Sequence, residues 1–320
     1  MNVSEVLSAI PVYNGERFLG STLESLAHQT RPPDTVVVID DGSTDGTCDV
    51  VNEFRGLRCE LIRNERNLGL FPNLNHALKY AERSEYFHLL LADDCVRPFF
   101  LERLAGALQE APPPSFAYCH YDWIDAEGRV IQAASRPNRG GFSPVNRETF
   151  LTRQSLLETI SVGSVLIRSG RRPLPVVFRA DMPHVADCVF FAELAAACQQ
   201  VIEGGDSLCE IRRHAENATQ RNRRNLNAWV ADEFLAMQRI SRLLSKRGWR
   251  GRMHGHRIQC LFAARSRVKQ QWTRKEDPDF AAQIGVVVAR ETAWYHRLLG
   301  SMAVFLRDMV VGKNLPDQPR

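Results

Sequence analysis

Two short, mostly apolar runs that each lead into a pair of adjacent aspartates constrain the fold of this chain more than any other feature. The first run, residues 35–41, ends in Asp40 and Asp41, and the second, residues 86–92, is followed by Asp93 and Asp94. A strand without polar alternation is covered on both faces, as strands are in parallel sheets. The pattern therefore predicts a parallel sheet with strands that end in carboxylates.

Segments with helical periodicity separate the predicted strands. Residues 16–28 carry leucines on one helical face, and residues 47–54 repeat apolar positions at helical spacing after Asp45, the predicted N-cap. The other elements expected in this half are a helix at 71–83 and strands at 3–12 and 58–63. This alternation predicts an α/β fold with right-handed crossovers.

The alternation continues less regularly after a helix that begins at Pro98 and ends before the prolines at 112–114. The further expected elements are strands at 115–123, 161–168 and 207–213, a loop at 136–147 and a helix at 189–200. From residue 221 to 313 the pattern is helical throughout. The sequence therefore predicts a domain of residues 1–220 and a helical extension of residues 221–320.

The charges of the chain are divided between these two parts. The formal net charge is +4, but from Arg221 onward the chain has 20 Lys and Arg against 8 Asp and Glu, a net charge of +12. The first 220 residues have 21 against 29, a net charge of −8. The chain is therefore an acidic body with a basic tail.

The cysteines and the N-terminal residues favour a cytoplasmic protein. The eight cysteines form no CxxC pair and no cluster with histidine, which is typical of thiols in a reducing compartment. Glu5 interrupts the place where the apolar core of a signal peptide would lie. No apolar run approaches the roughly 20 residues that cross a bilayer. We therefore expect a cytoplasmic protein without a cleaved leader.

The two aspartate pairs are expected at one edge of the sheet, because ligands of open parallel sheets bind outside the carboxyl ends of the strands. Four carboxylates that gather in one place repel each other unless a cation or hydrogen-bond donors lie among them. The arrangement therefore predicts a metal ion, a donor-rich ligand, or both.

Simpler interpretations exist for each pair. Asp40 and Asp41 fit an ordinary strand-end turn and helix cap, and Asp93 and Asp94 fit a solvated strand end. The segment from Asp41 matches the first half of an EF-hand loop, but its twelfth position is Asn52 and a strand precedes it. The P-loop and dinucleotide fingerprints are absent from the sequence.

Five motifs in order resemble glycosyltransferase family 2, whose members have the GT-A fold. They are PVYNGERFLGSTLESLAHQT (11–30), DDGSTDGT (40–47), NLG (67–69), LLLADDCVRPFFLERL (89–104) and RRHAENAT (212–219). The resemblance covers about the first 220 residues. It implies a mostly parallel, Rossmann-like sheet with flanking helices, a nucleotide-sugar donor, Mg²⁺ or Mn²⁺, and an inverting transfer to an acceptor hydroxyl.

The resemblance places the nucleotide among the first motifs. Asp41 is expected to accept a hydrogen bond from the N3-H of a pyrimidine, with Asp40 supporting the loop. The other residues that the resemblance places at the nucleotide are Pro11, Val12, Tyr13, Asn67 and Asp93, the last at the ribose. A core role for Tyr13 remains the simpler alternative.

The later motifs correspond to the metal, the base and the diphosphate. Asp94 is expected to bind the metal, with Asp93 beside it or holding a metal-bound water. Asp187, in PHVADCVFFAEL, aligns with the catalytic base of the family, and a helix N-cap is its alternative role. The segment Arg212, Arg213 and His214 corresponds to the basic residues near the diphosphate or acceptor, unless it is a surface cluster.

Two positions depart from the pattern of the family. Many members have a third aspartate two residues before the metal pair, where this chain has Leu91. Many also have a basic residue in the helix after NLG, where this chain has Leu74. The first difference leaves one carboxylate fewer in the acidic cluster. The second removes one possible contact with a phosphate or with the nucleotide base.

The basic tail lies outside the resemblance. Its last segment, residues 290–313, is amphipathic, with Trp294, Leu298 and Met302 on one side and Arg290 and Arg297 opposite. The residues that extend or widen the apolar side are Leu299, Phe305, Leu306, Met309 and Val310, and those that extend the polar side are Ser301 and Asp308. A helix docked internally or in a homo-oligomer interface is the simpler interpretation. An interfacial membrane helix is the alternative, and nucleic-acid binding is the least supported.

The sequence as a whole predicts a metal-dependent, inverting hexosyltransferase that uses a UDP- or dTDP-sugar. The expected acceptor is a glycan or a lipid-linked glycan in surface-polysaccharide biosynthesis, at the inner face of a membrane. The alternative is a catalytically silent subunit that binds a nucleotide sugar. Nucleotidyl transfer to a sugar phosphate is disfavoured, because PVYNGERF replaces the Gly-rich basic loop that it needs.

Overall fold

The chain forms two compact units. The computed structural model describes residues 5–311 except 135–139, 159, 215–224 and 245–247, and the side chains of residues 227 and 305–311 are also left out of the description. The first unit comprises residues 1–150, 159–179 and 190–215, and the second comprises residues 151–158, 180–189 and 216–320. The second unit thus takes in two segments that the sequence boundary at 220 assigns to the first part.

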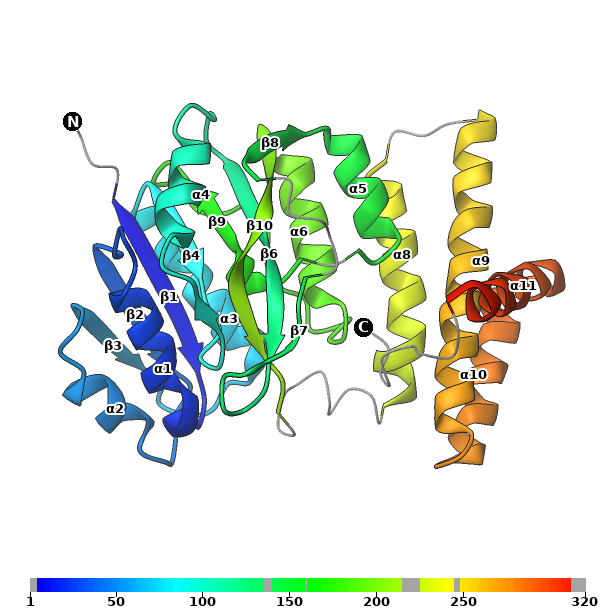
Figure 1. The fold of residues 1–320 in the computed structure, drawn as a ribbon, viewed down its shortest axis with the longest axis horizontal. Coiled ribbons are helices and arrows are strands. Elements are labelled where there is room, and N and C mark those ends of the chain that lie inside the picture. Colours follow the sequence, from blue (N-terminus) through cyan, green and yellow to red (C-terminus); the bar gives the residue numbers. More distant parts are fainter. Residues whose placement is uncertain (1–4, 135–139, 159, 215–224, 245–247, 312–320) are drawn as a thin grey trace. The chain divides into compact units, whose positions relative to one another are not determined.

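The first unit is built on one ten-stranded sheet (Figure 1). The strands are β1 (Val6–Val12), β2 (Thr35–Asp40), β3 (Cys59–Arg63), β4 (Tyr86–Leu89), β5 (Cys95–Val96), β6 (Ser115–Ile124), β7 (Val130–Gln132), β8 (Phe142–Val145), β9 (Val165–Arg168) and β10 (Gln200–Arg212). Their order is β3-β2-β1-β4-β9-β6-β10-β5, and β7 and β8 pair with β6 and β10.

Most of the sheet runs in one direction. β3, β2, β1 and β4 are parallel neighbours, and β6 and β10 are parallel to each other. Because β9 is antiparallel to both β4 and β6, the pair β6 and β10 points the same way as β4. These six strands therefore share one edge for their carboxyl ends. The predicted α/β fold with a mostly parallel central sheet is confirmed.

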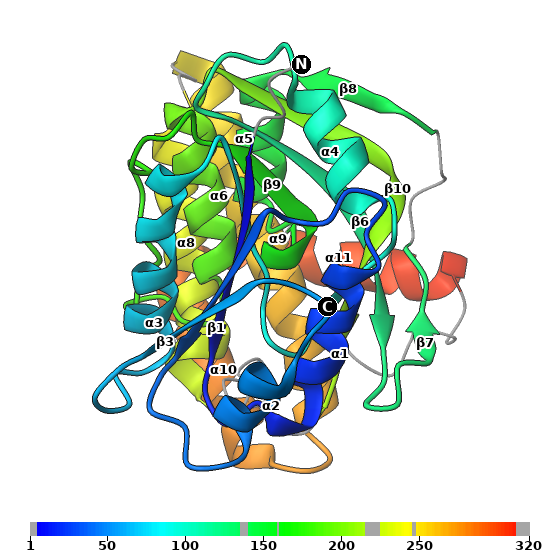
Figure 2. The same ribbon diagram turned by 90° about the vertical axis from the view of Figure 1, so that its left-hand side faces the viewer.

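Helices cover both faces of the parallel strands, as the unbroken apolar runs require. Figure 2 shows α1 (Glu16–Ala27) and α4 (Phe100–Leu108) on one side of β1 and α3 (Leu70–Leu78) on the other. Val36 and Val38 of β2 belong to the core cluster with the leucines of α1 and α4, and the intervening Val37 is equally buried. Alternate residues therefore meet different layers, and every position favours an apolar side chain.

Several local expectations differ from the structure. The helix α2 (Thr47–Glu53) has Gly46 as its N-cap rather than Asp45. Part of the expected loop at 136–147 is β8, which pairs with β10. The helix expected at 189–200 is α6 (Ala186–Ala197), and Gln200 already belongs to β10. Helix α5 (Arg147–Ser155) follows β8, and the short helices η1 (Lys79–Arg83) and η2 (Val162–Ser164) complete this part.

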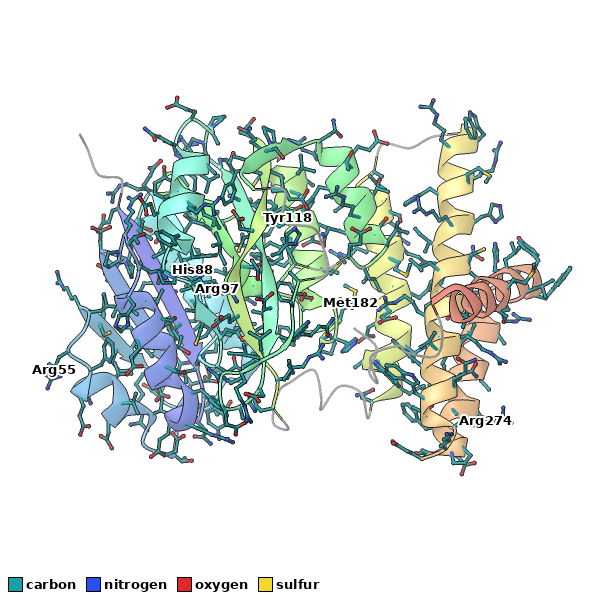
Figure 3. All side chains as sticks on the ribbon, in the orientation of Figure 1. Arg55, His88, Arg97, Tyr118, Met182 and Arg274 are labelled. Carbon is teal, nitrogen blue, oxygen red and sulfur yellow. The ribbon has the colours of Figure 1, made fainter. Side chains whose placement is uncertain are left out.

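The second unit is helical, which confirms the predicted helical extension; its side chains appear with those of the first unit in Figure 3. The π-helical η3 (Asn227–Ala231) leads into α8 (Asp232–Arg242), and α9 (Gly248–Thr273), α10 (Pro278–Glu291) and α11 (Trp294–Val311) follow. At the start of α10 the Asp277 side chain accepts a hydrogen bond from Phe280 N, and Pro278 occupies the first turn, where it needs no hydrogen-bond partner.

A buried cluster of charges joins α8 to α9. Glu233 Oε1 lies 2.8 Å from Lys269 Nζ and 3.0 Å from an Arg265 nitrogen, and Glu233 and Lys269 are both buried. Lys269 also donates to Trp229 O. Burial alone would raise the pKa of Glu233, but Arg265 and Lys269 outweigh it and lower the pKa to about 2. The carboxylate is therefore held ionised inside the unit.

Replacing Glu233 with Gln is expected to destabilise the second unit by about 3–5 kcal/mol, because the buried Lys269 and the half-buried Arg265 lose their counter-charge. Four of the five tryptophans, at positions 229, 249, 272 and 294, belong to this unit, so urea unfolding followed by tryptophan fluorescence reports on it. Glu291→Gln, which removes an exposed pair with Arg290, is the control and is expected to cost less than about 1 kcal/mol. Equal losses for the two variants would contradict this assignment.

Candidate active site

The carboxyl ends of the parallel strands bring the predicted residues of the first unit to one edge of the sheet. Val12 ends β1, Asp40 ends β2 and Arg212 ends β10, while residues 90–94 follow β4. These strands run in the same direction, and the arrows of β1 and β10 point the same way in Figure 1. In open α/β sheets this edge is where ligands bind.

Asp40 shapes the turn that follows β2. Its side chain is buried and accepts hydrogen bonds from Ser43 N at 3.2 Å. Arg63 Nε, from the end of β3, lies 3.3 Å from Asp40 Oδ2. These contacts agree with the expectation that Asp40 supports the loop, and they explain how a carboxylate is accommodated at the end of a buried strand.

Asp41 holds the loop between β3 and α3. Its Oδ1 accepts from Asn64 Nδ2 at 2.8 Å and from Leu68 N at 2.9 Å, and its Oδ2 accepts from Gly69 N at 2.8 Å. Gly69 has a φ of +94°, which favours glycine. A carboxylate has about four acceptor positions, and described residues of the chain occupy three of them. The expected contact with a pyrimidine base therefore has one position left and stays a prediction.

The loop after Asp41 is fastened to the start of α1. Asn14 N donates to Ser43 Oγ and Gly15 N donates to Thr47 Oγ1, each at 2.8 Å. In the reverse direction, Thr44 N donates to the Asn14 side chain at 2.9 Å. The small polar residues of this turn thus form hydrogen bonds to the loop after β1, and these bonds hold the loops after β1 and β2 together.

Asp94 provides an unsatisfied carboxylate oxygen. Its side chain is buried, Oδ1 accepts from Arg212 N at 2.9 Å, and Oδ2 has no hydrogen-bond partner within the part of the chain that the structure describes. Burial raises the pKa of Asp94 well above its usual value, and the charge of Asp93 raises it further. Gly163 packs closely in this region, since a Cβ added to it would lie 3.0 Å from Leu90 Cδ1 and 3.8 Å from Asp94 Oδ2.

A divalent cation fits this oxygen. Mg²⁺ and Mn²⁺ prefer oxygen ligands, and Mg²⁺ in nucleotide sites is held by one or two carboxylates together with phosphates and water. Among the described residues, no group of three or more His, Cys, Asp and Glu side chains forms a ready metal site. The residues present therefore suit a cation that takes most of its ligands from a diphosphate and from water.

Asp93 and His214 form a pair beside Asp94. His214 Nε2 lies 3.1 Å from Asp93 Oδ2, and the His214 ring lies 4.8 Å from the Phe18 ring between centroids. The Phe18 ring also lies 4.9 Å from Arg212 Cζ. The first turn of α1 thus supports the predicted basic segment, and this aromatic contact was not expected from the sequence.

Arg212 differs from the expectation of a diphosphate ligand. Its side chain is buried, and its guanidinium donates to Asp93 O at 2.8 Å and to Asp125 O and Ala126 O at 3.1 Å. These contacts hold the 93–94 loop to the strand end, which makes Arg212 a positioning residue. The neighbouring Arg213 is partly exposed, and its guanidinium stacks 3.8 Å from the Trp123 ring. Residues 215–219 of the RRHAENAT motif lie outside the described residues.

The remaining residues expected at the nucleotide line the same edge. Pro11 and Val12 are buried at the end of β1, and Val12 O accepts from Asp41 N at 2.8 Å. Tyr13 is 48% exposed, which removes the alternative of a core role for its ring. Asn67 is exposed, and its side chain accepts from Gly69 N at 2.8 Å.

Asp187 belongs to the second unit and lies in the first turn of α6, as expected from its place before an apolar run. Its Oδ1 accepts from Cys188 N at 2.8 Å. The residue keeps some exposed surface, but the surrounding chain desolvates the carboxyl and raises its pKa to about 6. A carboxylate with such a pKa accepts a proton more readily than an ordinary aspartate.

Two buried or half-buried asparagines were missed by the sequence analysis. Asn73 Nδ2 donates to Ile39 O at 3.0 Å and to Val12 O at 3.4 Å, so α3 is tied to the ends of β1 and β2. Asn64 Nδ2 donates to Asn73 Oδ1 at 3.1 Å as well as to Asp41. The available signal was the polar Asn73 beside Leu74 on the buried face of a predicted helix.

Comparisons with known sequences point to one family. The sequence profile described as Glycosyl transferase family 2 matches residues 9–174, just over half of the chain. An uncharacterized glycosyltransferase of Haemophilus influenzae is 25% identical over 187 residues, which are 57% of this chain and 58% of the relative. Glycosyltransferase GlyG of Streptococcus pneumoniae is 26% identical over 129 residues, 39% of this chain and 42% of the relative. The chain thus spans about half the length of these relatives.

Solved structures share the fold. S. aureus TarS 1–349 in complex with UDP-GlcNAc has a TM-score of 0.57 and 17% identity, over 91% of this chain and 93% of the TarS 1–349 chain. The mannosyltransferase PcManGT from Pyrobaculum calidifontis, in complex with GDP-Man and Mn²⁺, has a TM-score of 0.54 and 15% identity, over 97% of this chain and 88% of PcManGT. At this level of identity the likeness shows the fold alone.

Proposed function

This chain belongs to glycosyltransferase family 2, and from that premise we propose that it is a metal-dependent, inverting hexosyltransferase. The proposed donor is a UDP- or dTDP-sugar, and the proposed acceptor is a hydroxyl of a glycan or lipid-linked glycan in surface-polysaccharide assembly. The observation that carries the proposal is the buried Oδ2 of Asp94, which lacks a partner among the described residues at the edge where Asp40 and Asp41 shape the neighbouring loops.

The donor site is proposed along the loops after β1, β2 and β4. Tyr13 offers an exposed ring for the base, Asp41 offers its remaining acceptor position, and Asp93 is assigned to the ribose. The donor class is supported by the structural neighbours, since TarS is complexed with UDP and UDP-GlcNAc and PcManGT with GDP-Man. The proposal of a uridine or thymidine nucleotide rests on Asp41 as an acceptor for N3-H.

Asp94, with Asp93 beside it, is proposed to hold Mg²⁺ or Mn²⁺. When bound, the cation would neutralise negative charge on the diphosphate. A nucleoside diphosphate is a poor leaving group until its charge is neutralised in this way. Arg213 and His214 are the proposed donors to phosphate oxygens, because Arg212 is occupied by carbonyl oxygens of the chain. Charge-assisted hydrogen bonds from arginine and histidine suit that role.

Asp187 is proposed as the base. Its carboxylate takes the proton of the acceptor hydroxyl while the acceptor oxygen forms a bond to the anomeric carbon and the bond from that carbon to the diphosphate oxygen breaks. A single displacement inverts the anomeric configuration, because no sugar-enzyme bond is formed. The raised pKa of about 6 leaves Asp187 ionised at neutral pH and makes it a stronger base than an ordinary aspartate.

Thermal unfolding with nucleotides tests the donor site. UDP or dTDP with Mn²⁺ is expected to raise the Tm of the full chain, since a ligand at about a hundredfold excess over its Kd adds roughly 2.7 kcal/mol. EDTA is expected to reverse the shift, and adenosine diphosphate serves as the control nucleotide. Absence of a shift with every nucleotide would overturn the donor assignment. A shift that EDTA leaves intact would overturn only the metal.

A further inference from the structure

One stripe of α11 fixes how this helix packs on α9. The buried residues His296, Gly300 and Val304 recur every four positions and so lie on one side of the helix. His256 Nδ1 of α9 lies 2.8 Å from His296 Nε2. A Cβ on Gly300 would lie 2.9 Å from Ala264 N and 3.0 Å from Cys260 O, so only glycine allows this approach. The rotation of α11 about its axis is thereby set.

The large apolar side chains in residues 294–302 of α11 consequently point outward. The exposed fractions are 69% for Trp294, 39% for Tyr295, 52% for Leu298, 51% for Leu299 and 51% for Met302. We call these five residues the outer face of α11. Single exposed apolar residues are ordinary, but a contiguous group on one helix marks a binding surface. Over residues 294–302, the apolar side expected to dock internally is therefore turned away from α9. The side chains of Phe305, Leu306, Met309 and Val310, expected on the same side, lie outside the described residues.

The part of the chain that carries the outer face is basic. From Arg221 onward the chain has 20 Lys and Arg against 8 Asp and Glu. Arg252 and Arg257 of α9 are exposed, as is Arg290, which lies just before α11 and pairs with Glu291. Tryptophan and tyrosine are the residues that favour the region between lipid headgroups and acyl chains. The second unit thus combines an exposed apolar and aromatic helix face with a basic composition, which is typical of helices that lie in a membrane surface.

We propose that the outer face of α11 binds the surface of a bilayer that contains anionic phospholipids. No helix in the described ranges is long and apolar enough to cross a membrane, so the contact is with the surface. A second copy of this chain is a less suitable partner, because it would bring its own excess of positive charge to the contact. A bilayer with anionic lipids offers negatively charged headgroups to the basic side chains and an acyl region to the apolar side chains. This inference is independent of the proposed transfer reaction.

Vesicle co-sedimentation of the full chain tests the proposal. The protein is expected to sediment with vesicles of equimolar phosphatidylglycerol and phosphatidylcholine, and less with phosphatidylcholine alone. Replacing Leu298 and Leu299 with Ser removes two exposed leucines and is expected to lower the partition coefficient by about tenfold or more. The matched control is Val130→Ser with Ile131→Ser, which removes two side chains of similar exposure, 51% and 52%, from β7 of the first unit. Binding of this control should equal that of the unchanged chain.

Three results would overturn the proposal. The first is that the chain stays in solution with anionic vesicles. The second is that the Leu298 and Leu299 variant, with an unchanged Tm, binds as the original does. The third is that light scattering shows an oligomer that becomes monomeric in the variant without any change in vesicle binding, which would assign the outer face to a second copy.

Discussion

Replacing Asp94 with Asn is expected to lower sugar transfer by at least about a thousandfold, because a metal ion at a developing diphosphate is worth several kcal/mol. The amide oxygen of Asn can still accept from Arg212 N, so the 93–94 loop is expected to keep its place. The variant should also lose the EDTA-sensitive rise in Tm with UDP and Mn²⁺. Transfer is measured by release of the nucleoside diphosphate, and binding by thermal unfolding.

The same substitution is expected to leave the Tm of the protein alone unchanged or higher. The raised pKa of Asp94 means that an ionised carboxylate there destabilises the folded state, and a neutral amide removes that cost. A lower Tm would instead indicate a structural role. The matched control is Asp49→Asn, which removes an exposed carboxylate from α2 of the same unit. EDTA-sensitive nucleotide binding that persists in the Asp94→Asn variant would refute the metal assignment.

Replacing Asp187 with Asn is expected to lower transfer by about a hundredfold to ten-thousandfold, the range of general-base contributions. Nucleotide binding should be unchanged, because no donor contact is assigned to Asp187. Isothermal titration with UDP and Mn²⁺ measures the binding, and initial rates measure the transfer. Asp181→Asn, which changes an exposed aspartate of the same unit, is the control. Full activity in the Asp187→Asn variant would remove Asp187 from the mechanism.

The pH dependence of transfer should follow the Asp187 carboxyl. Its pKa is about 6, and only the ionised form accepts a proton, so kcat/KM is expected to fall about tenfold per pH unit below 6 and to level off above it. An ordinary aspartate would put this limb near pH ~4. The residual activity of Asp187→Asn should lack the limb near 6, and its persistence there would point to another group.

The parallel strands could be predicted because their signal is local. The apolar residues within 35–41 lie on both faces of the strand, and in the structure both faces of β2 are covered. The sequence pattern therefore reflects the burial that causes it. The strand β8 had no such signal, because Phe142–Val145 becomes a strand through its pairing with β10. The helix start at Gly46 has a similar cause. The Asp45 carboxylate, expected as the N-cap, also accepts from Glu16 N at 3.1 Å, at the start of α1.

The candidate site was predictable where a residue acts through its own chemistry. Asp94 is an example, since its place after a buried strand can be predicted from the sequence, whereas the burial that raises its pKa cannot. Arg212 shows the opposite, because its partners Asp93 O, Asp125 O and Ala126 O are backbone atoms that only the fold brings near. Asn64 and Asn73 also act through main-chain and side-chain partners far along the chain. A motif records which residue is present but not which of its hydrogen bonds are already used.

The second unit includes two segments from the middle of the chain, residues 151–158 and 180–189, and this limits where the chain can be truncated. Ser155 Oγ lies 3.2 Å from His254 Nε2, and Cys188 Sγ donates to Gln154 O within the same unit. A reading frame stopped at codon 220 would keep residues 151–158 and 180–189 but remove the helices that complete their unit. The C-terminal helices are consequently not an independent module that can be added or deleted without exposing the other two segments of the unit. We expect natural length variation to fall elsewhere in the chain.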